Sequence, residues 1–122
     1  MNAEQRLLIT RRANHQSYPG LWEFPGGKVE ADESVEMALS REMLEEVGVN
    51  VVASRFLGEV VTHEAIVLHV FLIEHWQGQA ACLESQLDLR WVSLDELADY
   101  AFPKANQAII DRLKVSIHAT RC

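Results

Sequence analysis

The chain has 122 residues, 48% of them hydrophobic, which is the length and composition of one globular domain with a real core. Its formal net charge of −7 argues against non-specific nucleic-acid binding, and its two cysteines are too few for a disulfide framework. It shows neither a signal peptide nor an apolar stretch of membrane-spanning length. We therefore expect residues 1–122 to form a single cytoplasmic domain, monomeric, without a nucleic-acid duplex or a membrane as partner.

The first half of the chain is predicted to contain two short strands and a helix. Residues 6–12 are apolar and β-branched at their centre, and residues 21–24 alternate before a proline and two glycines. The helix is predicted to start near residue 32 or 33, with acidic residues in its first turn, and to stop at Gly48. Its apolar stripe consists of Val35, Ala38, Leu39, Met43 and Val47.

The second half is predicted to contain three strands and a final helix. The strands cover residues 49–61, 64–76 and 89–92, with an interruption of the first at Gly58. Ser93 and Glu96 have the spacing of a capping box and predict a short helical turn.

The last helix is predicted over residues 105–117. One side of it carries Ala108, Ile109, Arg112 and Leu113. The order of strands, helix, strands and helix predicts an α/β (α+β) architecture, with a sheet packed between helices.

Three carboxylates in the first helix carry the chemistry. Glu42, Glu45 and Glu46 are three and four residues apart, so they project from one face of the helix. Like charges at this spacing destabilise a helix unless a cation lies between them, and hard divalent ions prefer carboxylate oxygens. The pattern predicts a metal site that handles phosphate, although an amphipathic helix with a solvated acidic face would have the same spacing.

The stretch from residue 27 to residue 49 resembles the Nudix box, the signature of hydrolases that act on nucleoside diphosphates linked to another moiety. The matching residues are Gly27, Glu33, Arg41, Glu42, Met43, Glu45, Glu46, Gly48 and Val49. The resemblance implies a mixed β-sheet sandwiched between helices, with the box forming a loop, a helix and a loop. It also implies an enzyme that hydrolyses phosphoric anhydride bonds with Mg²⁺, or Mn²⁺ as a substitute.

The resemblance assigns roles to the residues of the box. Glu45 and Glu46 are the first candidates for metal ligands and Glu42 the next, with Glu42 also our first choice for the general base. The Gly26 carbonyl is a further candidate ligand. Arg41 is expected to orient Glu45 through an ion pair, because it lies four residues earlier.

A glutamate outside the box is another candidate. In MutT-type members a glutamate on a loop before the last strand approaches the metal, and Glu84 has a similar position apart from one inserted residue. An exposed loop glutamate is the alternative.

Glu33 is expected to hold the loop against the helix.

Three segments resemble the MutT branch, whose members hydrolyse oxidised purine nucleoside triphosphates: residues 9–12, 21–28 and 102–106. They imply Asn106 as the reader of the purine edge, since a carboxamide both donates and accepts; an N-cap role is the alternative. Phe24 could lie against the base or belong to the core. Arg12 could contact phosphate or base, or be a surface charge, and Lys28 is a further candidate substrate contact.

The predicted activity is pyrophosphohydrolysis of 8-oxo-dGTP or a related purine nucleotide, a sanitation of the nucleotide pool that prevents replication errors. The alternatives are a pyrophosphatase for CTP or a modified dCTP, which usually has aspartate in place of Asn106, and a Nudix domain that binds a nucleotide or lesion without hydrolysis. Nudix chains usually have a strand upstream of the segment that matches residues 6–12. We therefore expect either a truncated N-terminus or another segment at that place in the sheet.

Overall fold

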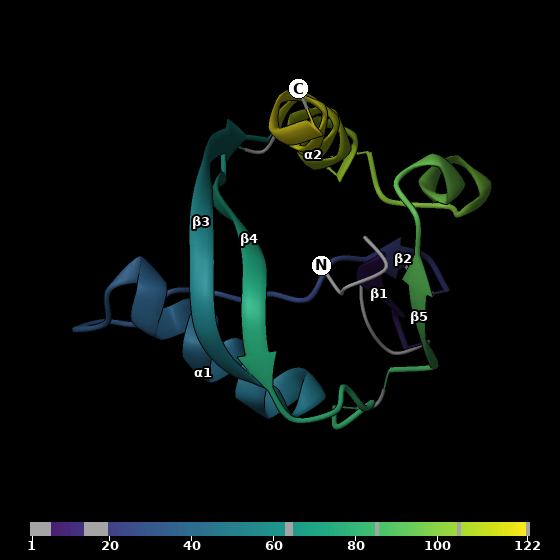
Figure 1. The fold of residues 1–122 in the computed structure, drawn as a ribbon. Coiled ribbons are helices and arrows are strands. Elements are labelled where there is room, and N and C mark those ends of the chain that lie inside the picture. Colours follow the sequence, from purple (N-terminus) through teal and green to yellow (C-terminus); the bar gives the residue numbers. More distant parts are fainter. Residues whose placement is uncertain (1–5, 14–19, 63–64, 85, 105, 122) are drawn as a thin grey trace.

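A computed structural model describes residues 6–13, 20–62, 65–84, 86–104 and 106–121 (Figure 1). The elements in chain order are β1 (Leu7–Arg11), β2 (Trp22–Glu23), α1 (Val35–Val47), β3 (Asn50–Val61), β4 (Val67–Gln77), β5 (Asp88–Val92), the short 3-10 helix η1 (Asp95–Asp99) and α2 (Asn106–Arg121). Neither of the two α-helices in these ranges has the length and apolar character needed to cross a membrane.

The strands form two antiparallel sheets. In one, β1 lies between β2 and β5; in the other, β3 pairs with β4. Figure 1 shows the two sheets on opposite sides of the molecule, with α2 at one end and α1 against the β3–β4 sheet at the other. The predicted α+β class is confirmed, but the expected single sheet is divided in two among the described strands. Residues 1–5 lie outside the described ranges, so the expectation about an upstream strand stays untested.

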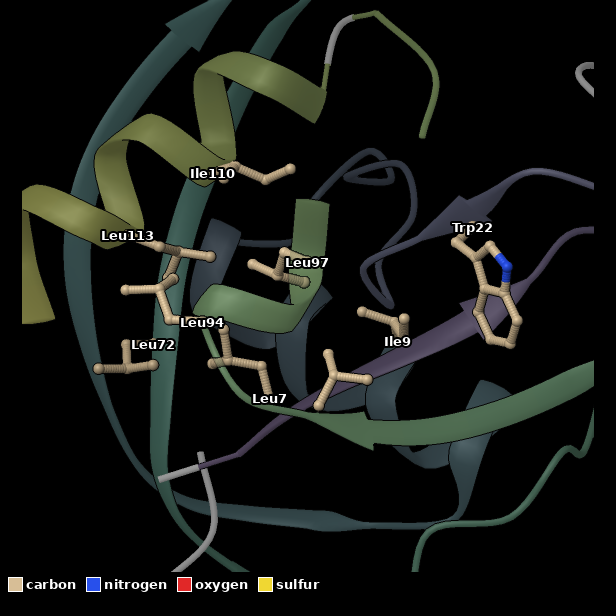
Figure 2. Close-up of a cluster of buried hydrophobic side chains, with 9 residues drawn as sticks. Leu7, Ile9, Trp22, Leu72, Leu94, Leu97, Ile110 and Leu113 are labelled. Atoms are coloured by element: carbon tan, nitrogen blue, oxygen red, sulfur yellow. The ribbon is translucent and has the colours of Figure 1, made fainter. Parts of the chain in front are cut away.

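A hydrophobic cluster holds the two sheets and α2 together (Figure 2). Its buried members come from β1, β2, β4, β5, the residues around η1, and α2: Leu7, Ile9, Trp22, Leu72, Val92, Leu94, Leu97, Ile110 and Leu113. Burial of each large side chain contributes about 1.5–3 kcal/mol. The cluster replaces main-chain pairing as the link between the two sheets.

A second, smaller cluster places α1. Met43 and Val47 on the helix and Val49 just after it are buried together, and β3 contacts the helix. Gly48 ends α1 in the left-handed conformation, with φ 74°, and its N–H donates to the Leu44 and Met43 carbonyls. The predicted stop at Gly48 is therefore confirmed.

The start of α1 was predicted too early. The helix begins at Val35, and Ser34 is its N-cap, with the hydroxyl accepting from the Met37 N–H at 3.1 Å. Asp32 has a positive φ of 68° and cannot be helical. Glu33 consequently lies in the loop before the helix, where its side chain can fold back over α1.

The buried side of α2 also differs from the prediction. Ile110 and Leu113 are buried, whereas Ala108 and Arg112 are exposed. Arg112 instead extends toward β3, where its guanidinium donates to the carbonyls of Leu57 and Glu59, both at 3.4 Å. These carbonyls flank Gly58, where the β3–β4 register shifts, so the interruption predicted at that glycine is confirmed.

Candidate active site

Arg41 is the centre of a network on the acidic face of α1. Its Nε and Nη2 donate to the two oxygens of Glu33 at 2.8 and 2.9 Å, and its Nη1 donates to Glu42 at 2.8 Å and to Glu45 at 3.2 Å. Nη2 also donates to the Lys28 carbonyl at 2.9 Å. The bidentate bond to Glu33 matches the planar guanidinium and fixes its orientation.

The network gives Arg41 a wider set of partners than the sequence predicted. The expected pair with Glu45 is present, but the shorter bonds go to Glu33 and Glu42. Hydrogen bonding to Arg41, together with the Glu30 N–H, lowers the pKa of Glu33 to about 2, and the Glu33 bond raises the pKa of Arg41 above its ordinary value. Glu33 thus fastens the loop to the helix, as expected.

Glu46 is held differently from the other two carboxylates. One oxygen accepts the Gly26 N–H at 2.9 Å, and the residue is half-buried. Burial raises the pKa of Glu46 to about 8, and the nearby charges of Glu42, Glu23 and Glu84 add to this effect. At neutral pH this carboxyl group therefore keeps a proton unless a cation compensates the surrounding negative charge.

The donor set fits a hard divalent cation. Glu42, Glu45 and Glu46 offer carboxylate oxygens, the ligand type that Mg²⁺ and Mn²⁺ prefer. Within the described ranges no three acidic, histidine or cysteine side chains are assembled as a ready cage, because Arg41 binds Glu42 and Glu45 while Glu46 turns to Gly26. Burial and the neighbouring charges of Glu42, Glu23 and Glu84, which raise the pKa of Glu46, are consistent with a site for positive charge.

Gly27 makes room for one of these carboxylates. A Cβ placed on Gly27 would overlap the carboxyl group of Glu42. The absence of a side chain at this position lets the loop pass directly over Glu42, within the same network that Arg41 organises. Gly27 therefore allows the close packing of the loop against the helix, whereas a Cβ on Gly26 would meet open space.

The loop before β5 brings Glu84 to the same end of α1. The Leu83 N–H and the Gln86 side chain both donate to the Glu46 carbonyl, at 3.0 and 3.1 Å. The Glu84 N–H donates to the Gln86 side chain at 2.8 Å. The negative charge of Glu84 reaches Glu46 and contributes to its raised pKa. The loop thus holds Glu84 near the carboxylates of the box, and Gln86, which the sequence analysis did not single out, fastens it there.

Arg12 has a partner within the protein and is not a simple surface charge. Its guanidinium forms an ion pair with Glu23, and both side chains are largely buried, with 21% and 24% exposed. Glu23 was not among the predicted site residues. The available signal was its position in the matching segment 21–28, where it pairs with Thr10, two residues before Arg12 on the same face of the hairpin.

The segments expected to hold the base lie side by side. Phe24 stacks on Phe102 with ring centres 5.4 Å apart and planes at 20°, and the Trp22 N–H donates to the Ala101 carbonyl at 2.7 Å. Both phenylalanines are partly buried against the main core, and a contact of Phe24 with the base stays a prediction. Asn106 is the first residue of α2 and is half-buried. The Lys28 side chain is exposed.

Comparison with known proteins agrees with this geometry. The NUDIX domain model matches residues 1–112. The 8-oxo-dGTP diphosphatase of Escherichia coli K12 is 38% identical over 118 residues, which are 93% of this chain and 89% of that protein. The CTP pyrophosphohydrolase of the same organism is 32% identical over 109 residues, 87% of this chain and 80% of that protein.

Solved structures similar to this chain include a MutT protein. A MutT structure from work on Aliivibrio salmonicida and Vibrio cholerae has a TM-score of 0.82 and 35% identity, with 92% of this chain and 87% of that chain covered. The resemblance inferred from the box is therefore confirmed, and the chain belongs to the Nudix family.

Proposed function

We propose that the protein is a metal-dependent nucleoside triphosphate pyrophosphohydrolase that converts 8-oxo-dGTP, or a related purine nucleotide, to the monophosphate and pyrophosphate. The observation that carries the proposal is the half-buried Glu46 at the Gly26 loop, inside the negative field of Glu42, Glu23 and Glu84. The likeness to the Escherichia coli 8-oxo-dGTP diphosphatase supports this choice of substrate.

The carboxylates of α1 are proposed to hold Mg²⁺, with Mn²⁺ as a substitute. Glu45, Glu46 and Glu42 supply the ligands, and Glu84 and the Gly26 carbonyl complete the set. When bound, the ion supplies charge neutralisation for the phosphate oxygens. Arg41 orients Glu42 and Glu45 through the bonds already described.

The proposed reaction is attack of water at the β-phosphorus. The water oxygen bonds to that phosphorus, the bond to the oxygen bridging the α- and β-phosphates breaks, and that oxygen leaves with the monophosphate. Glu42, packed under Gly27, is the first choice for the base that takes the proton of the water. The site therefore needs only positioning and charge compensation, as phosphoryl transfer generally does.

The purine is proposed to bind beside the Phe24–Phe102 stack. This stack joins the end of β2 to the segment that leads into α2, so Asn106 follows directly after one wall of the proposed pocket. A carboxamide can pair with a base edge through one donor and one acceptor. Arg12 and Lys28 are assigned to the phosphate side.

A pyrimidine substrate is the second candidate. The 32% identity to a CTP pyrophosphohydrolase favours it, whereas Asn106 favours the purine, since pyrimidine enzymes of this group usually have aspartate there. A binding domain without activity is the third possibility. The retention of Glu42, Glu45 and Glu46 argues against it, because a domain that only binds has no need for three ligand carboxylates.

The test is a comparison of kcat/KM for 8-oxo-dGTP, dGTP and CTP, with Mg²⁺ and with EDTA. Release of pyrophosphate from 8-oxo-dGTP in preference to the others, only with metal, supports the proposal. A preference for CTP rejects the purine assignment and keeps the reaction. Absence of turnover with every substrate rejects the enzyme. The monomeric state and the cytoplasmic location stay predictions from the sequence.

A further inference from the structure

The Arg12–Glu23 pair lies on one face of the β1–β2 hairpin. Thr10 is paired with Glu23 and Arg11 with Trp22, so the next residue, Arg12, is a diagonal neighbour of Glu23. Diagonal neighbours are about 7–8 Å apart at the backbone, within reach of long side chains on the same face. The main chain of Arg12 is fixed as well, because its N–H donates to the Leu21 carbonyl at 2.8 Å and its carbonyl accepts from Gly20 at 3.0 Å.

This pair is next to the carboxylates of α1. The chain runs from Glu23 through Phe24 and Pro25 to Gly26, whose N–H is bound to Glu46. Glu23 is near enough to Glu46 for its charge to act on that group. The guanidinium of Arg12 is therefore bonded to a carboxylate that is three residues before the loop residue bound to Glu46.

The electrostatic repulsion that Glu23 causes at this position is not offset by the folding stability that its ion pair with Arg12 provides. Its negative charge repels Glu46 and an anionic substrate alike. A partly exposed ion pair returns only about 0–1 kcal/mol of stability. The side chain of a free arginine, however, has about 2 kcal/mol of rotamer entropy to lose when it binds a ligand, and a partner that already restrains it reduces that loss.

We propose that Glu23 is a positioning residue, which holds the Arg12 guanidinium in place to bind the phosphate chain of the nucleotide. The inference rests on the proposed function for the identity of the ligand. Glu23 bonds to Nη1 of a planar group that has five N–H donors in a fixed fork. Because the guanidinium is planar, a bond to Nη1 also fixes the directions of its other N–H groups. Glu23 therefore acts on the substrate through Arg12, without touching the substrate itself.

The test is a double-mutant cycle with Glu23→Gln and Arg12→Ala. Loss of a charge-assisted bond predicts that Glu23→Gln raises KM for the nucleotide about tenfold, with kcat nearly unchanged. In the Arg12→Ala background, Glu23→Gln is expected to change KM no further, because the group that it orients is gone. Glu23→Asp, which keeps the charge, should restore part of the affinity. Glu74→Gln, at an exposed carboxylate on β4, is the matched control and should match the wild type.

Two results would overturn the inference. One is an equal rise in KM in both backgrounds, which would mean that Glu23 acts through Glu46 or the metal. The other is an unchanged KM with only a lower melting temperature, which would make the pair purely structural. The same cycle is measured by calorimetric binding of a nucleotide with a methylene group between the α- and β-phosphates. An inactive wild type that still shows the coupling in binding would refute the proposed function and keep the role of Glu23.

Discussion

Replacing Glu46 by glutamine should stabilise the metal-free protein at alkaline pH. The pKa of Glu46 is raised from 4.5 to about 8 in the folded protein, first by burial and then by Glu42, Glu23 and Glu84. Between these two values the folded state keeps a proton that the unfolded state has released, so the stability of the wild type falls as the pH rises. Glu46→Gln resembles the protonated form at every pH and retains an oxygen that can accept the Gly26 N–H.

The size of the effect follows from the shift in pKa. A full conversion of the shift would give about 5 kcal/mol, at 1.36 kcal/mol for each pKa unit. Glu46 is only half-buried, and solvent screening reduces this to about 1–3 kcal/mol. For a domain of this size that difference corresponds to a melting temperature about 4–12 °C higher for the glutamine variant at alkaline pH.

Urea or thermal unfolding in EDTA, followed by circular dichroism, measures the effect at about pH 5 and about pH 8.5, on either side of the folded pKa. The quantity of interest is the stability of Glu46→Gln minus that of the wild type, since other titrating groups cancel in this difference. It should be small at the lower pH and large at the higher one. Mg²⁺ should then stabilise the wild type more than the variant. A difference that does not change with pH would refute the raised pKa, and Glu36→Gln on the same helix is the control.

Three further predictions concern the loop, the network and the base. Gly27→Ala should displace the Glu42 carboxylate and lower kcat about 10–100-fold with the fold retained, as judged by circular dichroism and steady-state kinetics. Arg41→Lys should weaken the bond to Glu33 and lower stability above pH 4.5. Because Glu33 has a pKa of about 2, the wild type should lose this advantage as the pH falls from 4.5 toward 2; equal acid-unfolding curves would contradict this. Asn106→Ala should raise KM for 8-oxo-dGTP more than for CTP, and equal losses would remove it as the base reader.

Local patterns were enough to predict most elements. Alternation, helical spacing and glycine positions depend on a few neighbouring residues, and β1, α1, β3 and the end of α1 at Gly48 agree with them. The start of α1 was wrong because acidic residues suit both a first turn and the loop before it. Only the Ser34 hydroxyl on the Met37 N–H decides between these alternatives.

Contacts between distant segments could not be predicted in the same way. The division into two sheets depends on which strands pair, and strand pairing has no local signature. The buried side of α2 is formed by Ile110 and Leu113, which pack in the main cluster with residues of distant strands, while Arg112 donates to carbonyls on either side of Gly58. The spacing of the box predicted which carboxylates share a face, but not that Arg41 holds two of them while Glu46 turns to Gly26.

This division of partners has a consequence for metal affinity. Arg41 bonds to Glu42 and Glu45 but also to Glu33, so its single positive charge compensates these carboxylates only in part, while burial favours the protonated form of Glu46. A cation must then compete with a guanidinium for Glu42 and Glu45, and with a proton for Glu46. The first competition does not change with pH, because arginine stays charged, whereas the second does. Metal affinity should therefore rise with pH until Glu46 is ionised and then level off. The same partly buried carboxyl group thus controls both metal binding and the stability of the metal-free protein at alkaline pH.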